Sequence, residues 1–134
     1  MEFGNARFKY EAGIFVLNHV QWGTENIDYT QAVAWNMTPA EFQRFVQLLH
    51  SVIEQDSNYY KLMKRPDKKS YYNDYNWLLS SGYSHLGTYD GIDIFAVLNR
   101  VGTSKFLVIE LLSRTGSKEF KYSNRIDINL GQEE

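Results

Sequence analysis

The 134-residue sequence contains no cysteine. This absence excludes a disulfide scaffold, a thiolate zinc site, an iron–sulfur cluster and a cysteine nucleophile. A chain of this length can bury about two thirds of its unfolded surface, so it needs no disulfide or metal for stability. We therefore expect a single α+β domain over residues 1–134, and we expect no cofactor.

Long apolar runs are also missing. Runs such as Gly13–Leu17 and Phe106–Ile109 are far shorter than the ~20 residues that cross a bilayer. The N-terminal residues are charged and mixed, without the apolar segment that follows the basic start of a signal peptide. We predict no membrane contact and a cytoplasmic location, in the host cell if a phage encodes the chain.

Nucleotide-binding motifs are absent as well, since no P-loop lysine follows a glycine-rich turn and no GxGxxG follows a strand pattern. Gly82, Gly87, Gly91 and Gly102 are spaced as turn residues. His19, His50 and His85 lack the close spacing of a zinc motif such as HExxH, so we expect no metal site. We expect His50 to be half-buried and bonded to the backbone.

Strand patterns occupy both ends of the chain, where apolar residues recur with period two. Residues around Phe8 and Tyr10, then Ile14–Trp22 and Ile27–Trp35, predict a three-strand antiparallel meander. The later strands are expected at Ile92–Asn99, Lys105–Leu112, Lys118–Tyr122 and Arg125–Leu130. Asp90-Gly91 suits a type I′ hairpin turn. Lys105–Leu112 is apolar on both faces and predicts a strand covered on both sides.

The clearest local signal is the helix start at Thr38-Pro39-Ala40-Glu41. Thr38 and Glu41 form the pattern of a capping box, and a proline at the first helical position loses no hydrogen bond. The pattern predicts a helix over about residues 39–55. Its apolar stripe consists of Phe42, Phe45, Val46, Leu49, Val52 and Ile53.

Two shorter helices are expected between the long helix and the C-terminal strands. Tyr59–Lys64 forms the first, which Pro66 ends, and the second runs from about Ser70 to a left-handed cap at Gly82. The predicted fold is therefore α+β. One antiparallel sheet combines the N-terminal three-strand meander with C-terminal β-hairpins, and the long amphipathic helix packs across one of its faces.

A cationic and aromatic segment runs from Ser57 to Trp77. It carries a net charge of +3, whereas the whole chain carries −2, so the remainder sums to −5. Pro66 divides the segment, and we predict that its charges project from a helix–loop–helix corner. The candidate partner-binding residues are Tyr59, Tyr60, Lys61, Lys64, Arg65, Lys68, Lys69, Tyr71 and Tyr72.

Such a surface on an acidic body indicates a negatively charged partner. The preferred interpretation is a non-enzymatic inhibitor or adaptor, of the phage or mobile-element accessory type, that docks on an acidic protein surface with tyrosines and Arg65 as anchors. The same residue types bind phosphates and bases, so nucleic-acid or nucleotide binding is the alternative. The overall acidity disfavours that alternative. A solvated loop without a partner is the remaining interpretation.

A small hydrolase is the weakest alternative, and no catalytic residue is assigned. Glu110 interrupts an apolar run. It either faces the core as a perturbed carboxylate or marks the solvent face, paired across the sheet with a lysine or arginine. Asp93 alternates with isoleucines and is expected to face solvent, close to His85 across the hairpin.

The last strand suggests self-association. Ile126, Ile128 and Leu130 give it a mildly apolar edge. Pairing two such edges in a symmetric dimer is one way to protect them, so a homodimer is a further hypothesis.

Overall fold

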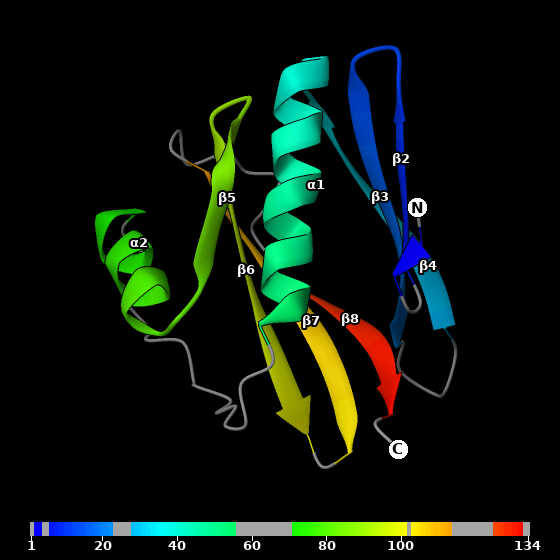
Figure 1. Cartoon of the computed structure of the whole chain (residues 1–134), viewed down its shortest axis with the longest axis vertical. Coiled ribbons are helices and arrows are strands. Elements are labelled where there is room, and N and C mark those ends of the chain that lie inside the picture. Colours follow the sequence, from blue (N-terminus) through cyan, green and yellow to red (C-terminus); the bar gives the residue numbers. More distant parts are fainter. Residues whose placement is uncertain are drawn as a thin grey trace.

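The described strands form two antiparallel sheets that follow one another along the chain (Figure 1). The computed structural model describes residues 2–3, 6–22, 28–55, 71–101, 103–113 and 125–132. The first sheet has the strand order β1-β2-β3-β4 and the second β5-β6-β7-β8. Their bounds are Glu2–Phe3 (β1), Ala6–Glu11 (β2), Ile14–Trp22 (β3), Asp28–Asn36 (β4), Ser84–Tyr89 (β5), Ile92–Val101 (β6), Ser104–Ser113 (β7) and Arg125–Gln132 (β8).

The α+β class is confirmed, but the prediction of one sheet is wrong. Among the described strands, each group pairs only within itself, and the sheets meet through side chains in a shared core. Alternation along a strand fixes which side chains face the core, but it does not state which strand supplies the next hydrogen-bonded neighbour. A two-sheet arrangement therefore has the same pattern as a one-sheet arrangement.

The long helix α1 spans Pro39–Glu54, close to the predicted range. Its capping box is present: the Thr38 N–H donates to Glu41 Oε1 at 2.9 Å, and the Glu41 N–H donates to Thr38 Oγ1 at 3.1 Å. The predicted stripe faces inward, with Phe45, Leu49 and Val52 buried. The helix therefore begins where local hydrogen bonding dictates and lies where its apolar face can be covered.

The main core joins α1 to both sheets. The ring of Phe15 on β3 lies 5.0 Å from that of Phe45 and 5.5 Å from that of Trp35. At the start of the helix, the Tyr10 hydroxyl donates to the Met37 carbonyl at 2.8 Å. These contacts hold the first sheet against α1. The prediction of a single domain over 1–134 is consistent with this shared core and stays a prediction.

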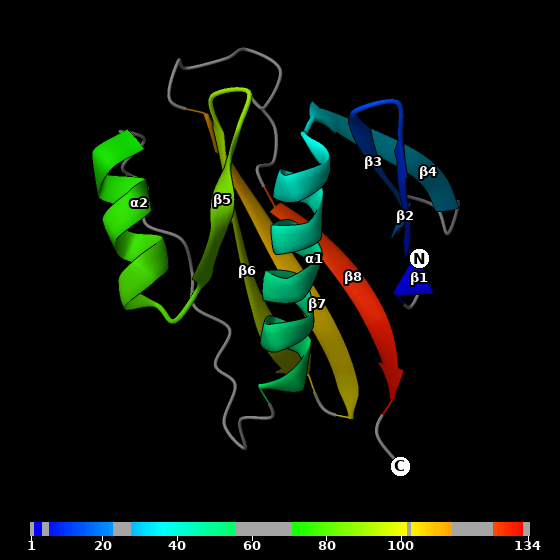
Figure 2. The same cartoon turned by 45° about the horizontal axis from the view of Figure 1, so that its top comes forward.

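The second sheet is covered on both faces (Figure 2). Ile94 on β6 points into the main core beneath α1, whereas its neighbour Phe95 points into a smaller core on the opposite face. Leu78 of α2 (Tyr71–Ser80) closes that smaller core. On β7, every residue from Leu107 to Leu112 is buried, which confirms the prediction of a doubly covered strand.

Helix α2 confirms the second of the two short helices. It ends at Ser80, and the predicted left-handed residue follows at Gly82, which has φ +91°. The Tyr83 N–H donates to the Leu78 carbonyl at 3.0 Å. The Asp90-Gly91 turn also has positive φ at both residues, +52° and +75°, as type I′ geometry requires. The helix predicted over 59–64 and the strand predicted over 118–122 lie outside the described residues.

Two predictions about surface residues, one for the last strand and one for His50, can be compared with the structure. Ile126 and Ile128 are buried in the main core, so their side chains are not free to contact a second copy, and the homodimer stays a hypothesis. His50 is exposed rather than half-buried. None of the helices among the described residues is long and apolar enough to cross a membrane.

Candidate functional site

The predicted partner-binding surface falls largely outside the described residues. Tyr59, Tyr60, Lys61, Lys64, Arg65, Lys68 and Lys69 lie in the undescribed range 56–70, and Tyr71 and Tyr72 open α2. The structure therefore neither brings these side chains together nor separates them. It does describe a polar cluster and a pocket around β5, the edge strand of the second sheet.

A bulge in β5 determines where its side chains point. His85 pairs with Phe95 and Gly87 pairs with Ile94, so Leu86 is an extra residue in the ladder. In a regular strand, residues 85 and 88 would face opposite sides because successive side chains alternate. Because of the extra residue, His85 and Thr88 point to the same face of the sheet, where both contact the side chain of Asp93.

Asp93 is the acceptor at the centre of this cluster. Its Oδ1 lies 2.8 Å from His85 Nε2 and also accepts from the Thr88 hydroxyl. The carboxylate is fully buried, so the prediction that it faces solvent is wrong. The alternation with Ile92 and Ile94 is correct, but α2 and its smaller core cover the face that the pattern assigned to water.

The imidazole ring of His85 also packs against two aromatic rings. Its ring centroid lies 4.9 Å from that of Phe95 and 5.8 Å from that of Tyr75, and 28% of its side chain is exposed. The contact through Nε2 fixes the direction of the imidazole ring. The ring is thus oriented by a buried acid and two aromatic neighbours.

Glu110 lies on the same face of the sheet. It is 2% exposed, opposite Phe95 on β6 and opposite Arg125 in the backbone register of β8. The expectation that Glu110 marks a solvent face is therefore wrong, because the side chain is buried. Asp93 and Glu110 are diagonal neighbours across β6 and β7, which brings together the acids that the hydrolase hypothesis invoked.

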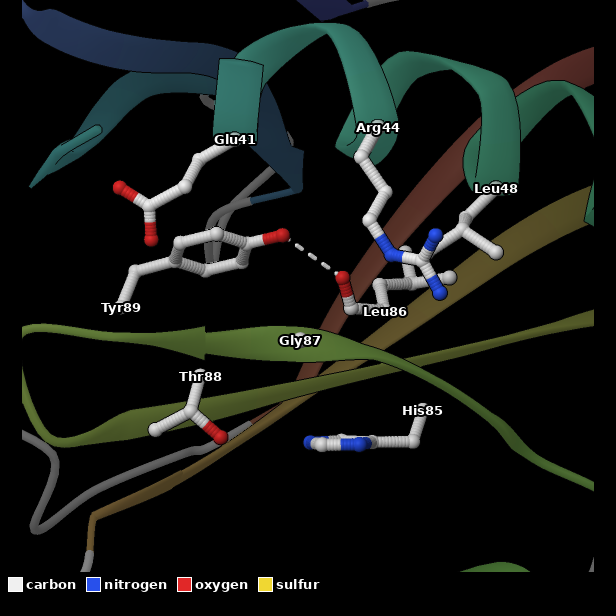
Figure 3. A pocket seen from close by; sticks show the side chains of 8 residues that line it. All are labelled: Glu41, Arg44, Leu48, His85, Leu86, Gly87, Thr88 and Tyr89. Atoms are coloured by element: carbon white, nitrogen blue, oxygen red, sulfur yellow. Dashed lines mark hydrogen bonds between the residues drawn. The ribbon is translucent and has the colours of Figure 1, made fainter. Parts of the chain in front are cut away.

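A pocket of about 260 Å³ lies between α1 and β5 (Figure 3). Helix α1 contributes Glu41, Arg44 and Leu48, and β5 contributes residues 85–89. Leu86 and Tyr89 line the side that faces α1, whereas His85 and Thr88 lie on the other side of the strand (Figure 3). The pocket therefore reaches around β5, the edge strand among the described strands of the second sheet.

Tyr89 and Gly87 give this edge its shape. The Tyr89 hydroxyl donates to the Leu86 carbonyl at 2.7 Å, and its ring meets Phe45 edge-on at 6.0 Å. Burial raises the pKa of Tyr89, and the carboxylate of Glu41 raises it further, while Arg44 acts in the opposite direction. Gly87 has φ +128°, and any Cβ there would collide with the Tyr89 hydroxyl.

Sequence reasoning placed Asp93 close to His85, but it missed the bulge and the pocket. Gly87 was expected in a turn, but it belongs to the bulged strand. A glycine two residues before a tyrosine in a strand is the signal that could have pointed to it, because glycine inside a strand often marks a bulge. Within the described ranges, no group of three or more histidine, aspartate or glutamate side chains is arranged to hold a metal ion.

No family model, curated protein or solved structure matches this chain.

Proposed function

We propose that this protein is a non-enzymatic binding protein, an inhibitor or adaptor of the phage or mobile-element accessory type, which contacts an acidic partner through residues 57–77. The observation that carries the proposal is the charge distribution: this segment has a net charge of +3 on a chain whose remainder carries −5. Opposite potentials steer two proteins toward each other and select the register of the contact.

The anchoring of the segment supports the proposal. It begins three residues after the end of α1, which packs on one face of the second sheet, and its residues 71–77 belong to α2, which packs on the opposite face. Leu78 is fully buried at that second anchor. A basic segment tied at both ends to a packed sheet loses less freedom on binding than a free tail would, which favours affinity.

Affinity capture from the source cells tests this proposal. The bait is the full chain, either unchanged or with Lys64, Arg65 and Lys68 each replaced by glutamate. A matched control replaces Arg7, Lys9 and Lys105, cations of β2 and β7, in the same way. We expect one reproducible protein partner with the unchanged chain and the control, and its loss with the first variant. A partner retained by both variants would contradict the proposal.

Nucleic-acid or nucleotide binding through the same segment is the alternative. Lysine and arginine neutralise phosphates, and tyrosine faces stack on bases. Gel-shift assays with single- and double-stranded oligonucleotides at low salt separate the two functions. A shift that weakens with salt and disappears after charge reversal at Lys64, Arg65 and Lys68 would favour this alternative over a protein partner.

The His85–Asp93 pair supports a second candidate function, a small hydrolase. A buried acid that orients an imidazole beside a pocket is an arrangement that general-base catalysis uses. The test is turnover of esterase, nuclease and phosphatase substrates by the purified protein. Activity that persists in both His85→Ala and Glu110→Gln would dismiss this centre.

A further inference from the structure

Glu41 and Arg44 carry opposite charges three residues apart on α1, a spacing at which such side chains commonly pair. Among the described residues, however, no ion pair reaches either of them. Figure 3 shows both side chains extending from α1 toward β5, on either side of the hydrogen bond from Tyr89 to Leu86. One pocket thus presents a separate anionic group and a separate cationic group.

Each of these groups retains binding capacity. Glu41 uses Oε1 to accept the Thr38 N–H, which leaves Oε2 to accept from a ligand. The guanidinium of Arg44 belongs to an exposed residue and offers donors in a planar fork that matches a carboxylate. One turn further along α1, Leu48 adds apolar surface to the same pocket (Figure 3).

The two charges restrict the kind of ligand. A simple anion is attracted by Arg44 and repelled by Glu41. A simple cation is attracted by Glu41 and repelled by Arg44. Only a molecule that carries both charges gains from both residues. The volume of about 260 Å³ is below the ~300 Å³ at which pockets for drug-sized ligands begin, so the molecule must be compact.

The edge of the sheet also disfavours a peptide strand as the occupant. Bulges and covering elements are the usual means by which proteins prevent strand addition at an edge. Here the bulge lies within the pocket, at Leu86 and Gly87, and the strand runs between α1 and α2 (Figures 1 and 2).

We propose that the pocket between α1 and β5 binds a small zwitterion with the chemistry of a free α-amino acid. Arg44 binds the carboxylate, Glu41 binds the ammonium group, and Leu48 contacts an apolar side chain. This site lies outside residues 57–77 and does not depend on the proposed partner surface.

The test is an NMR titration of the ¹⁵N-labelled full chain with L-leucine, N-acetyl-leucine and leucinamide. Leucine should shift the amide signals of residues 86–89 in a saturable manner. Each analogue lacks one charge and should bind about tenfold more weakly or worse, because a hydrogen bond to a charged group is lost. No saturable shift with leucine, or equal shifts with all three compounds, would overturn the proposal.

Variants assign the binding to the two side chains. Glu41→Gln keeps an acceptor for the capping box while it removes the charge, and Arg44→Gln alters an exposed residue. Each should weaken leucine binding about tenfold. Glu54→Gln, at the far end of the same helix, is the matched control and should bind as the unchanged chain does. Normal leucine binding by Glu41→Gln would contradict the assignment.

The two proposals fail separately. Charge reversal at Lys64, Arg65 and Lys68 should leave leucine binding unchanged, whether or not it removes a protein partner. Loss of leucine binding in a reversal variant that keeps its melting temperature would contradict the independence of the two sites.

Discussion

Nε2 of His85 lies 2.8 Å from Oδ1 of Asp93, and a single extra residue in β5 makes this contact possible. The bulge turns Thr88 to the same acceptor. A fully buried carboxylate is costly unless it is hydrogen-bonded, so these donors are part of what stabilises the second sheet.

A double-mutant cycle measures this interaction. His85→Ala and Asp93→Ala should each lower the free energy of unfolding by about 1–3 kcal/mol, because each leaves a buried or half-buried polar group with fewer partners. The double variant should be less destabilised than the sum of the two, with a coupling of about 0.5–3 kcal/mol. Urea denaturation provides the three values, and additive losses would show that the contact contributes nothing.

Gly87→Ala should be more destabilising than Gly82→Ala. Both glycines have positive φ, but a Cβ at Gly82 meets no atom within 4 Å, whereas a Cβ at Gly87 meets the Tyr89 hydroxyl and ring. Relieving such a clash in a packed region costs about 1–3 kcal/mol beyond the shared backbone strain. Chemical denaturation of the two variants gives the difference, and equal losses would mean that Tyr89 moves away freely.

Tyr89→Phe should change the response of the fold to alkaline pH. The pKa of Tyr89 in the folded state is raised above its ordinary value of 10.0, so the folded chain holds the proton more tightly than the unfolded chain. This contribution to stability is fully present below about pH 10 and is lost as the pH rises through the raised pKa.

The melting temperatures of both proteins across this range provide the measurement. Below pH 10 the variant should be less stable by about 1 kcal/mol, because the bond to the Leu86 carbonyl is lost. Above pH 10 the gap should narrow, since only the unchanged chain has this phenol to ionise. A gap that stays constant through the alkaline range would contradict the raised pKa.

Thr38→Ala should lower the free energy of unfolding by about 1 kcal/mol, because the Glu41 N–H loses its side-chain acceptor at the start of α1. Thr38→Ser retains a hydroxyl at the same position and should recover most of this loss. Thermal denaturation of the pair checks the prediction, and equal stability of the alanine and serine variants would rule out the cap as the cause.

Local signals in the sequence predicted the elements well. The capping box predicted the start of α1. The dipeptide Asp90-Gly91 predicted a turn with two positive φ angles. The apolar run of β7 predicted burial on both faces of the sheet. Each of these depends on residues close together in the chain. The division into two sheets depends instead on which strands pair, which short-range alternation does not specify.

The burial of the polar cluster could not be predicted for a related reason. Asp93 alternates as a solvent-facing residue should, and only the packing of α2 over that face buries it. His85 and Thr88 reach it because of a bulge, which shifts side-chain direction without a strong sequence signal beyond Gly87. The pocket likewise requires α1 and β5 to be adjacent in space, although they are far apart in the chain.

The affinity of the captured partner for the purified protein tests the central claim most directly. Dissociation constants are measured for the unchanged chain, for the reversal at Lys64, Arg65 and Lys68, and for the reversal at Arg7, Lys9 and Lys105, at about 50 mM and about 200 mM salt. If residues 57–77 contact an acidic partner, only the reversal at Lys64, Arg65 and Lys68 should weaken binding tenfold or more, which is about 1.4 kcal/mol. Higher salt should also weaken the complex of the unchanged chain. Equal dissociation constants for all three proteins would contradict the claim.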